Sequence, residues 1–295
     1  MTAEGLLIKG YNGFYYVESM GHLWSCSLRG RFRIKKQTFL PGDLVRITVV
    51  DDAKSHGVIE EVMERKNELL RPHVANVDRA VITFALQNPK PDLLLLDRIL
   101  IQVLDAKIQP LLCFNKADLV SEEERHSLIH PYQKAGFDVI TVSANTGEGI
   151  QALRSAIHGN LIVMAGPSGA GKSSILNALN ARFHLETGEL SKKVERGKHT
   201  TRRVELLPLD DTTYIADTPG FSSLFLPEGI ERPNLQRFYP EFAPFSEECP
   251  YLSCLHDKER DCGIKDAVEQ GKIDRGRYER YCVFLEELKE REGKY

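Results

Sequence analysis

A glycine-rich octapeptide with one lysine and one serine is the clearest candidate for chemistry in this chain. It reads G-P-S-G-A-G-K-S over residues 166–173, after an apolar run and before a helical pattern, as the G-x-x-x-x-G-K-[ST] motif requires. Its bent backbone turns N–H groups toward phosphates, its Lys172 reaches the β- and γ-phosphate oxygens, and its Ser173 ligates Mg²⁺. A chance glycine-rich turn is the weaker alternative. The predicted phosphate-binding residues are Gly166, Pro167, Ser168, Gly169, Ala170, Gly171, Lys172, Ser173 and Ser174.

Two segments that follow apolar runs indicate which base is bound. N-K-A-D (115–118) resembles the guanine-reading N-K-x-D motif of translation-type GTPases, in which the aspartate accepts hydrogen bonds that adenine cannot donate in that pattern. S-A-N (143–145) follows the next apolar run and resembles the segment that gives backbone donors to the guanine oxygen. Taken alone, N-K-A-D could be a helix cap. Together the segments predict a guanine site built from Asn115, Lys116, Asp118, Ser143, Ala144 and Asn145.

Two further segments resemble the parts of these GTPases that hold magnesium and sense the γ-phosphate. D-T-P-G (217–220) resembles their D-x-x-G motif. The resemblance implies that Asp217 holds Mg²⁺ through water and that the Gly220 N–H contacts the γ-phosphate. The segment G-K-H-T-T, which ends at Thr201, is a candidate first switch. By comparison with related GTPases, Thr201 rather than Thr200 completes the metal shell beside the phosphate-loop serine.

The order of these motifs differs from that of a standard GTPase. There the phosphate loop comes first, followed by the switch threonine, D-x-x-G, N-K-x-D and S-A-x. Here N-K-x-D and S-A-N precede the phosphate loop. The order predicts a circularly permuted domain, which keeps its site because termini that lie close together can be joined by a short link. It also places the first switch and D-x-x-G directly before the C-terminal segment.

Three cysteines and one histidine crowd into fourteen residues near the C-terminus. The spacing C-x4-C-x-H-x5-C joins Cys249, Cys254, His256 and Cys262. Three sulfurs and one imidazole make a full tetrahedral set for structural zinc, with no position left for a catalytic water. Unligated cysteines are the alternative, whereas disulfides are disfavoured in a cytoplasmic protein. One zinc ion would hold together a proline-rich segment that has little core of its own.

The sequence pattern of residues 1–68 is typical of a small β-barrel. Short runs rich in Val, Ile, Tyr and Phe alternate with Gly, Asn and Pro-Gly turns, and an OB-fold is one candidate. After the third run, basic residues occupy every second position from 29 to 35, which predicts a strand with its cations on one face. This strand is either a solvated face or a ribbon that tracks RNA phosphates. Its cations are Arg29, Arg31, Arg33 and Lys35, and Phe32 and Ile34 would face inward.

The remaining sequence predicts two more domains. In residues 69–226, near-continuous apolar runs alternate with helical patterns at 93–106, 121–135, 148–157 and 172–182, which is typical of an α/β domain with a mostly parallel sheet. Ligands bind at the carboxyl ends of such strands, where the motifs stand. Residues 227–295 open with prolines and close with one amphipathic helix. The expected fold is therefore a multidomain α/β protein with a β-barrel, a permuted GTPase domain and a helical zinc-binding domain.

Composition limits the partners and the compartment. The 295 residues carry 39 basic and 42 acidic side chains, a net charge of −3, so contact with RNA must use local patches. No apolar run is long enough for a membrane span, and the N-terminal residues lack the features of a signal peptide. We expect a cytoplasmic protein without a membrane contact. No extended hydrophobic surface indicates a dimer, so we expect a monomer.

The combined motifs resemble one family over essentially the whole chain. A small barrel, a permuted GTPase with G-P-S-G-A-G-K-S and G-K-H-T-T, and a C-x4-C-x-H-x5-C segment are similar to the RsgA family of small ribosomal subunit biogenesis GTPases. The resemblance implies an N-terminal OB-fold and GTP hydrolysis to GDP stimulated by the 30S subunit. It also implies a late role in 30S maturation, contacts of the outer domains with 16S rRNA, and release of assembly factors.

The residue that positions the hydrolytic water and the residues that bind RNA need separate hypotheses. Many GTPases carry a glutamine directly after D-x-x-G, but this chain has Phe221, so we expect low intrinsic turnover and assign the role to His199. His199 could instead pack or contact RNA. Cations around the first switch, among them Lys198, Arg202 and Arg203, would grip RNA in a γ-phosphate-dependent way. Two rival functions remain: a GTP-regulated RNA-binding switch with incidental hydrolysis, and a catalytic zinc site.

Overall fold

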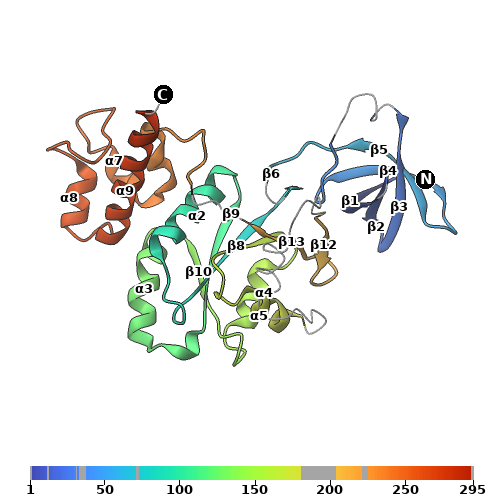
Figure 1. The fold of residues 1–295 in the computed structure, drawn as a ribbon, viewed down its shortest axis with the longest axis horizontal. Coiled ribbons are helices and arrows are strands. Elements are labelled where there is room, and N and C mark those ends of the chain that lie inside the picture. Colours follow the sequence, from blue (N-terminus) through green and yellow to red (C-terminus); the bar gives the residue numbers. More distant parts are fainter. Residues whose placement is uncertain are drawn as a thin grey trace.

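The computed structural model describes residues 2–11, 13–30, 32, 38–70, 73–180, 204–220 and 225–293. Three bodies follow one another along the chain (Figure 1): an N-terminal barrel, a central sheet with helices on both faces, and a C-terminal group of helices. This arrangement confirms the predicted fold class. The predicted domain boundaries at residues 68 and 226 stay predictions. Among the described residues, no helix combines the length and the apolar character that crossing a bilayer requires.

The N-terminal body is a closed five-stranded barrel in the order β1-β2-β3-β5-β4, with β1 paired to both β2 and β4. Alternate residues of its strands are buried, including Leu7, Val17 and Trp24, as expected for strands with one face in a core. The OB-like barrel expected from the sequence is confirmed. Its strands are β1 (Thr2–Tyr11), β2 (Phe14–Ser19), β3 (His22–Leu28), β4 (Leu44–Asp51) and β5 (His56–Val62).

The prediction of a cationic strand from residue 29 to residue 35 is wrong at its start. Strand β3 ends at Leu28, and the chain then turns helically, with the Phe32 N–H donating to the Arg29 carbonyl at 3.1 Å. The helical turn brings the Phe32 ring into the barrel core, edge-on to Phe39 at 5.3 Å. The inward position expected for Phe32 is therefore reached by a helical turn rather than by a strand. Arg31, Arg33 and Lys35 lie outside the described residues.

The central body is a six-stranded sheet in the order β10-β9-β8-β11-β13-β12. Every pair is parallel except β12–β13, an antiparallel edge that the sequence pattern did not predict. A short hairpin, β6 (Glu68–Leu70) and β7 (His73–Ala75), lies between barrel and sheet. The sheet strands are β8 (Arg79–Ala85), β9 (Gln109–Asn115), β10 (Asp138–Thr141), β11 (Leu161–Ala165), β12 (Leu206–Pro208) and β13 (Tyr214–Gly220).

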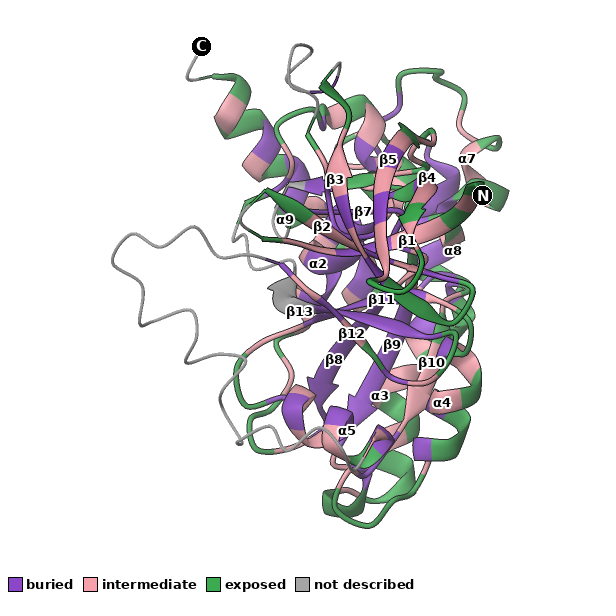
Figure 2. Ribbon diagram, turned by 90° about the vertical axis from the view of Figure 1, so that its right-hand side faces the viewer, coloured by how far each residue is buried: buried purple, intermediate pink, exposed green. Residues whose placement is uncertain are grey.

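Helices cover both faces of this sheet, and Figure 2 shows its strands buried between them. α2 (Leu93–Asp105) and α3 (Glu122–Lys134) pack on one face, where Leu96, Ile99 and Tyr132 join the larger core. α4 (Ile150–Ile157) and α5 (Lys172–Leu179) pack on the other face with Leu153 and Ile175. Burial on both faces explains why the strands read as continuous apolar runs. The four predicted helices are confirmed.

The C-terminal body has its own hydrophobic core, and one face of α2 contributes to that core. Leu235, Phe242 and Phe284 are fully buried there together with Ile101 of α2. The predicted amphipathic helix is α9 (Arg275–Glu292). The shorter elements are η2 (Arg232–Phe238), η3 (Pro240–Phe242), α7 (Ala243–Ser246) and α8 (Gly263–Glu269).

A buried ion cluster fastens the C-terminal body to α2. Arg277 of α9 is 1% exposed and donates to Asp97 of α2 and to Glu241, both at 2.7 Å. Arg280 donates to the second oxygen of Asp97 at 2.5 Å. The Arg277 guanidinium also lies 4.8 Å from the centre of the Tyr239 ring. Two cations face two carboxylates, so the cluster is neutral as a whole and its charges are paired despite burial.

Replacing Arg277 by alanine tests the importance of this cluster. The substitution leaves Asp97 and Glu241 buried without their common partner, and the free energy of unfolding should fall by about 3–5 kcal/mol. Urea titration followed by circular dichroism measures the change. Lys289→Ala removes an exposed ion pair on the same helix and should change stability by less than about 1 kcal/mol. Equal effects of the two substitutions would show that the buried cluster adds little.

Candidate nucleotide site and metal cluster

The predicted phosphate loop lies where β11 ends and α5 begins, at the carboxyl edge of the sheet. Its backbone needs glycine at two points. Gly166 has φ +121°, and a Cβ there would meet the Thr83 carbonyl oxygen at 2.0 Å. Gly171 has φ +89°, and a Cβ there would meet the Asn115 amide nitrogen at 2.1 Å. The motif glycines therefore let the loop lie directly against β8 and against the predicted guanine-binding segment.

The side chain of Lys172 folds back into the phosphate loop. Its ammonium donates to the carbonyls of Gly166 and Pro167, both at 2.7 Å. Burial lowers the pKa of this ammonium to about 8. Within the same loop and helix start Ser173 and Ala170 are buried, Gly166, Pro167, Gly171 and Ser174 are half-buried, and Ser168 and Gly169 are exposed.

Asn115 joins the phosphate loop to the S-A-N segment. Its carboxamide is 2% exposed, donates to the Ala170 carbonyl at 3.0 Å and accepts from the Ala144 N–H at 3.2 Å. Three loops that are far apart in the sequence therefore meet at one side chain. Ser143 is buried, and its hydroxyl accepts from the Thr146 N–H at 3.1 Å, which closes the turn that exposes Asn145.

Lys116 and Asp118 lie on the outer side of this junction. Lys116 has φ +63°, and its ammonium donates to the Asn88 carbonyl in the loop between β8 and α2. Asp118 is exposed in the 3-10 turn η1 (Ala117–Leu119). Its carboxylate is thus accessible at the sheet edge on which the phosphate loop also lies.

The backbone of the D-x-x-G segment runs beside the phosphate loop. β13 pairs in parallel with β11, and Gly220 lies opposite Ala165, the residue before Gly166. The side chains of Asp217 and its neighbours to Gly220 are outside the described part of the chain. So are the predicted switch residues Lys198, His199, Thr201, Arg202 and Arg203. Of the barrel cations, Arg29 is described, and it pairs with Glu60 at 2.6 Å while 57% of its side chain is exposed.

The predicted metal ligands come together in the C-terminal body. One ligand atom from each of Cys249, Cys254, His256 and Cys262 lies within 4.8 Å of the others. The Nδ1 atom of His256 is 3.5 Å from the Cys249 sulfur and 3.4 Å from the Cys262 sulfur, and these two sulfurs are 4.0 Å apart. A tetrahedral zinc with usual bond lengths places sulfur and nitrogen about 3.5 Å apart and two sulfurs about 3.8 Å apart.

Surrounding contacts fix the imidazole in a metal-binding orientation. The Nε2 atom of His256 lies 2.9 Å from the Gln236 side-chain oxygen, so Nε2 carries the proton and Nδ1 is free to face the sulfurs. Burial lowers the pKa of His256 and favours the neutral ring. The donor set, its spacing and the histidine tautomer all fit a bound metal ion.

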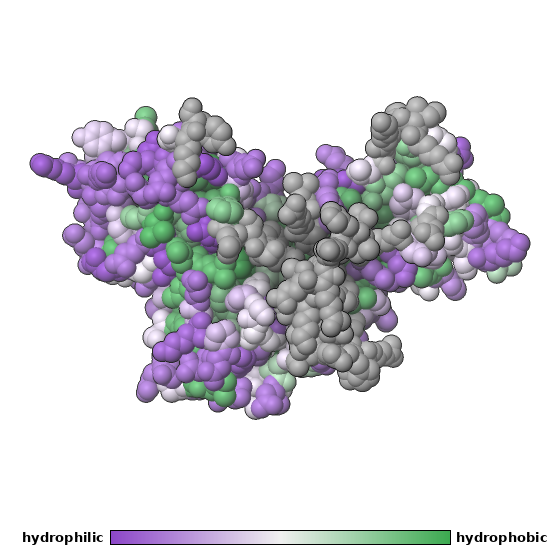
Figure 3. All heavy atoms as spheres, in the orientation of Figure 1, coloured by the Kyte–Doolittle hydropathy of each residue, from purple (hydrophilic) through white to green (hydrophobic). Residues whose placement is uncertain are grey.

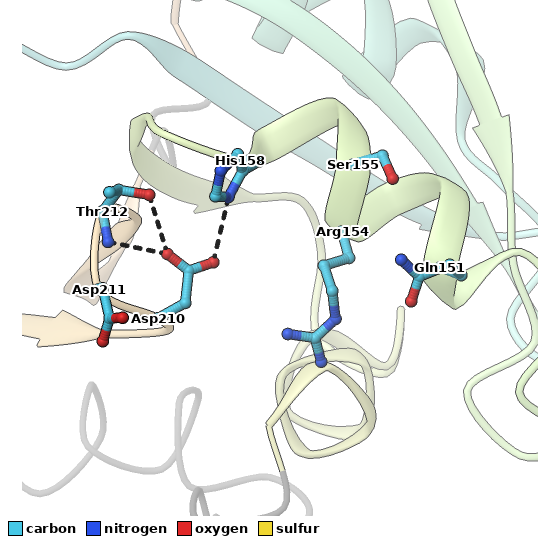
Figure 4. Close-up of a pocket in the computed structure, with 7 residues that line it drawn as sticks. All are labelled: Gln151, Arg154, Ser155, His158, Asp210, Asp211 and Thr212. Atoms are coloured by element: carbon cyan, nitrogen blue, oxygen red, sulfur yellow. Dashed lines mark hydrogen bonds and ion pairs between the residues drawn. The ribbon is translucent and has the colours of Figure 1, made fainter.

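A surface pocket that sequence reasoning missed lies at the opposite edge of the sheet (Figure 4). It is lined by one side of α4, by His158 directly after that helix, and by the turn between β12 and β13. Burial disfavours ionised Asp210, but hydrogen bonds from Thr212 and Thr213 outweigh it and lower its pKa to about 2. His158 lies 3.5 Å from the same carboxylate. These contacts stabilise a turn at the amino ends of the strands, far from the edge where ligands of α/β sheets bind.

Family models match most of the chain. Residues 62–227 match the RsgA GTPase model, and residues 4–59 match the RsgA N-terminal domain. The small ribosomal subunit biogenesis GTPase RsgA of Moorella thermoacetica is 47% identical over 292 residues, which cover 99% of both chains. The protein of the same name from Caldanaerobacter subterraneus is 43% identical over 289 residues, 98% of this chain and 97% of that protein.

Solved structures agree with the family models. The crystal structure of YjeQ from Thermotoga maritima matches with a TM-score of 0.83 at 33% identity, covering 98% of this chain and 99% of that one. The crystal structure of YloQ, a circularly permuted GTPase, matches with a TM-score of 0.83 at 34% identity, covering 99% and 96%. The fold is therefore that of a circularly permuted GTPase, an enzyme that hydrolyses GTP. Within that class, the chain belongs to the RsgA GTPase family.

The lowered pKa of Lys172 predicts how nucleotide affinity depends on pH. Phosphates bind the protonated lysine, so the affinity for GDP should be constant below pH 8 and fall as the free lysine loses its proton above it. Fluorescence titration with a labelled GDP between pH 7 and 9 measures this. Lys172→Arg keeps the charge at every pH used and reports any titration of the nucleotide itself. Parallel pH profiles for the two proteins would contradict the prediction.

Proposed function

We propose that this chain hydrolyses GTP when the 30S ribosomal subunit stimulates it. It would act in late 30S maturation through binding of 16S rRNA and release of assembly factors. The observation that carries the proposal is the meeting of the permuted GTPase motifs at Asn115, in a chain whose full-length relatives are named small ribosomal subunit biogenesis GTPases. The structure supports the nucleotide site directly, and the family supports the ribosomal partner.

The nucleotide roles follow from the geometry of the sheet edge. The backbone of residues 166–174 would surround the phosphates, and Lys172 would exchange its two carbonyl partners for phosphate oxygens as GTP enters. Asp118 would read guanine, with Asn115 and Lys116 supporting the loop and Ser143, Ala144 and Asn145 lining the base oxygen. Mg²⁺ would be held by Ser173, Thr201 and Asp217, and it neutralises charge on the β- and γ-phosphates.

The hydrolytic water requires a positioning group outside the usual place. Phe221 follows D-x-x-G and has no polar atom with which to orient water. We assign this role to His199 in the first switch, acting when the 30S subunit contacts that segment. Low turnover without the subunit follows from the same assignment, because the water then has neither a base nor an acceptor.

The C-terminal cluster would hold one structural zinc ion through Cys249, Cys254, His256 and Cys262. Four protein ligands leave no open position, so the ion would stabilise the fold rather than activate water. The RNA contacts would come from Arg29, Arg31, Arg33 and Lys35 of the barrel and from Lys198, Arg202 and Arg203 of the first switch. The exposed side chain of Arg29 supports this proposal. We also propose that the protein works in the cytoplasm as a monomer.

The presence of Phe221 after D-x-x-G is also compatible with a second function, which we therefore test against the first. A GTPase without a positioned water can act mainly by binding, with GTP setting its affinity for RNA and hydrolysis incidental. The two functions differ in whether the ribosomal subunit raises turnover. Affinity that depends on GTP while turnover stays constant would support this second function.

Multiple-turnover GTP hydrolysis separates these functions. Turnover should rise tens-fold or more when purified 30S subunits are added, and should not rise with 50S subunits. His199→Ala should remove most of the rise and leave GDP affinity unchanged. His126→Ala, an exposed histidine on α3, is the matched control and should respond as the unchanged protein does. Full 30S stimulation of His199→Ala would rule out the assigned role, and no stimulation of the unchanged protein would favour the binding switch.

The metal proposal predicts one zinc ion per chain. Elemental analysis of the purified protein should find it, and Cys254→Ser should lower both the zinc content and the thermal stability of the C-terminal body. Cys282→Ala removes a cysteine of α9 outside the cluster and should keep the zinc. Intrinsic GTP turnover, assayed with Mg²⁺ in excess, should survive removal of the zinc by mild chelation, since the zinc is structural. Loss of that turnover before any unfolding would instead indicate a catalytic metal.

A further inference from the structure

A buried hydroxyl without a hydrogen-bond partner lies beside the phosphate loop. Hydrophilic side chains cover much of the visible side of the molecule in Figure 3, as expected for groups that bind water. Thr83 of β8 is instead 0% exposed, and its Oγ1 atom has no partner in the described part of the chain. A hydroxyl that has left water without gaining a replacement bond lowers the stability of the fold. Its presence therefore points to a state of the protein in which that bond is made.

Packing alone does not require a threonine at this position. The run A-V-I-T-F-A-L (80–86), most of which forms β8, has Thr83 as its one polar side chain. Val81 and Met164 share this face of the sheet and belong to the core under α4 and α5. Valine has nearly the same shape as threonine, with a methyl group in place of the hydroxyl, and would fill the space without the desolvation cost. The hydroxyl is thus an addition to an otherwise apolar strand.

The phosphate loop begins directly against Thr83. β8 pairs in parallel with β11 up to Ile82 opposite Ala165, so Thr83 and Gly166 are neighbours where the loop leaves the sheet. A Cβ on Gly166 would meet the Thr83 carbonyl oxygen at 2.0 Å and its backbone nitrogen at 3.3 Å. On the other side Thr83 pairs with Cys113 of β9, and burial raises the pKa of that thiol to about 12. The neighbouring strands therefore offer Thr83 a loop backbone and a neutral thiol.

Lys172 occupies the carbonyl acceptors at the start of the loop. Its ammonium donates to the carbonyls of Gly166 and Pro167, both at 2.7 Å. A phosphate group that draws the ammonium away leaves these two carbonyls without a charge-assisted donor. A hydroxyl donor beside Gly166 can then replace the ammonium. Thr83 is the residue beside Gly166, and its hydroxyl has no competing partner in the described part of the chain.

We propose that Thr83 is a positioning residue for the phosphate loop, whose hydroxyl donates to a carbonyl that Lys172 releases when it turns to a nucleotide phosphate. This inference rests on the proposed function, because it uses the exchange of Lys172 partners assigned there. The nucleotide-free fold carries the unpaired hydroxyl, and the nucleotide-bound fold pairs it. A bond that exists only in the bound state adds to the affinity for the ligand. Thr83 therefore trades stability of the empty site for affinity toward guanine nucleotides.

Two substitutions of Thr83 should change stability and affinity in opposite directions. Thr83→Val removes the hydroxyl and keeps the shape, so the thermal midpoint of the nucleotide-free chain should rise by about 2–4 °C while GDP affinity falls about five- to ten-fold. Thr83→Ser keeps the hydroxyl and removes a methyl group, so the midpoint should fall while GDP affinity stays within about two-fold. Circular dichroism during heating and fluorescence titration with a labelled GDP measure the two quantities.

Thr213 supplies a matched control at the opposite edge of the sheet. It is also 0% exposed, but its hydroxyl donates to Asp210 and accepts from the Gly159 N–H, both at 3.0 Å. Because this hydroxyl is already paired, Thr213→Val should lower the thermal midpoint and leave GDP affinity unchanged.

Removing the ammonium of Lys172 should reverse the stability effect at Thr83. In Lys172→Met the two loop carbonyls lack their cation even without nucleotide, so the Thr83 hydroxyl can pair there. Adding Thr83→Val to this variant should therefore lower the thermal midpoint instead of raising it. The same sign in both backgrounds, or an unchanged GDP affinity of Thr83→Val alone, would overturn the inference. If the unchanged chain does not bind GDP, the proposed function fails and the inference fails with it.

Discussion

The carboxamide of Asn115 is the contact on which the nucleotide site depends. It donates to the phosphate loop and accepts from the S-A-N segment, and it is almost completely buried. A shorter side chain could not reach both loops, and a carboxylate could not donate to the Ala170 carbonyl. Since the three loops belong to β9, β10 and β11, their meeting depends on the parallel sheet rather than on the order of the chain. This explains how a permuted sequence can keep the arrangement of a standard site.

Helix α2 ties this site to the C-terminal body. The loop before α2 accepts a hydrogen bond from Lys116 and lies beside Gly169 of the phosphate loop. Further along the same helix, Asp97 holds Arg277 and Arg280 of α9, and Ile101 enters the C-terminal core. The loop before α2 therefore contacts the guanine motif, and α2 itself contacts the ion cluster in its first half. Rigid packing of this kind makes the C-terminal body move with α2 rather than independently of it.

The fold and the site were predictable from the sequence to different extents. The phosphate loop, the guanine motif and the cysteine cluster were identified because a few residue types at fixed spacing carry the chemistry, and the elements around them followed from apolar periodicity. The edge strand β12 was missed because its three residues are too few to show a period. The Arg277 cluster was also missed, because its members lie up to 183 residues apart and each resembles a surface charge in the sequence. The alternation rule placed Phe32 correctly in the core but gave the wrong backbone, because a helical turn after Leu28 buries the ring against Phe39 as well as a strand would.

The barrel is attached to the element that follows the first switch. Lys9 of β1 pairs with Glu205 at 2.6 Å, directly before β12, and Ile8 is buried in the core of the central sheet. Both outer bodies are therefore fastened to elements that border the nucleotide motifs, the barrel at β12 and the C-terminal body at α2. A displacement of either element on nucleotide exchange must carry a whole body with it, because a packed contact moves as a unit. A large partner that contacts both outer bodies can sense such a displacement, whereas a partner bound to one body alone cannot.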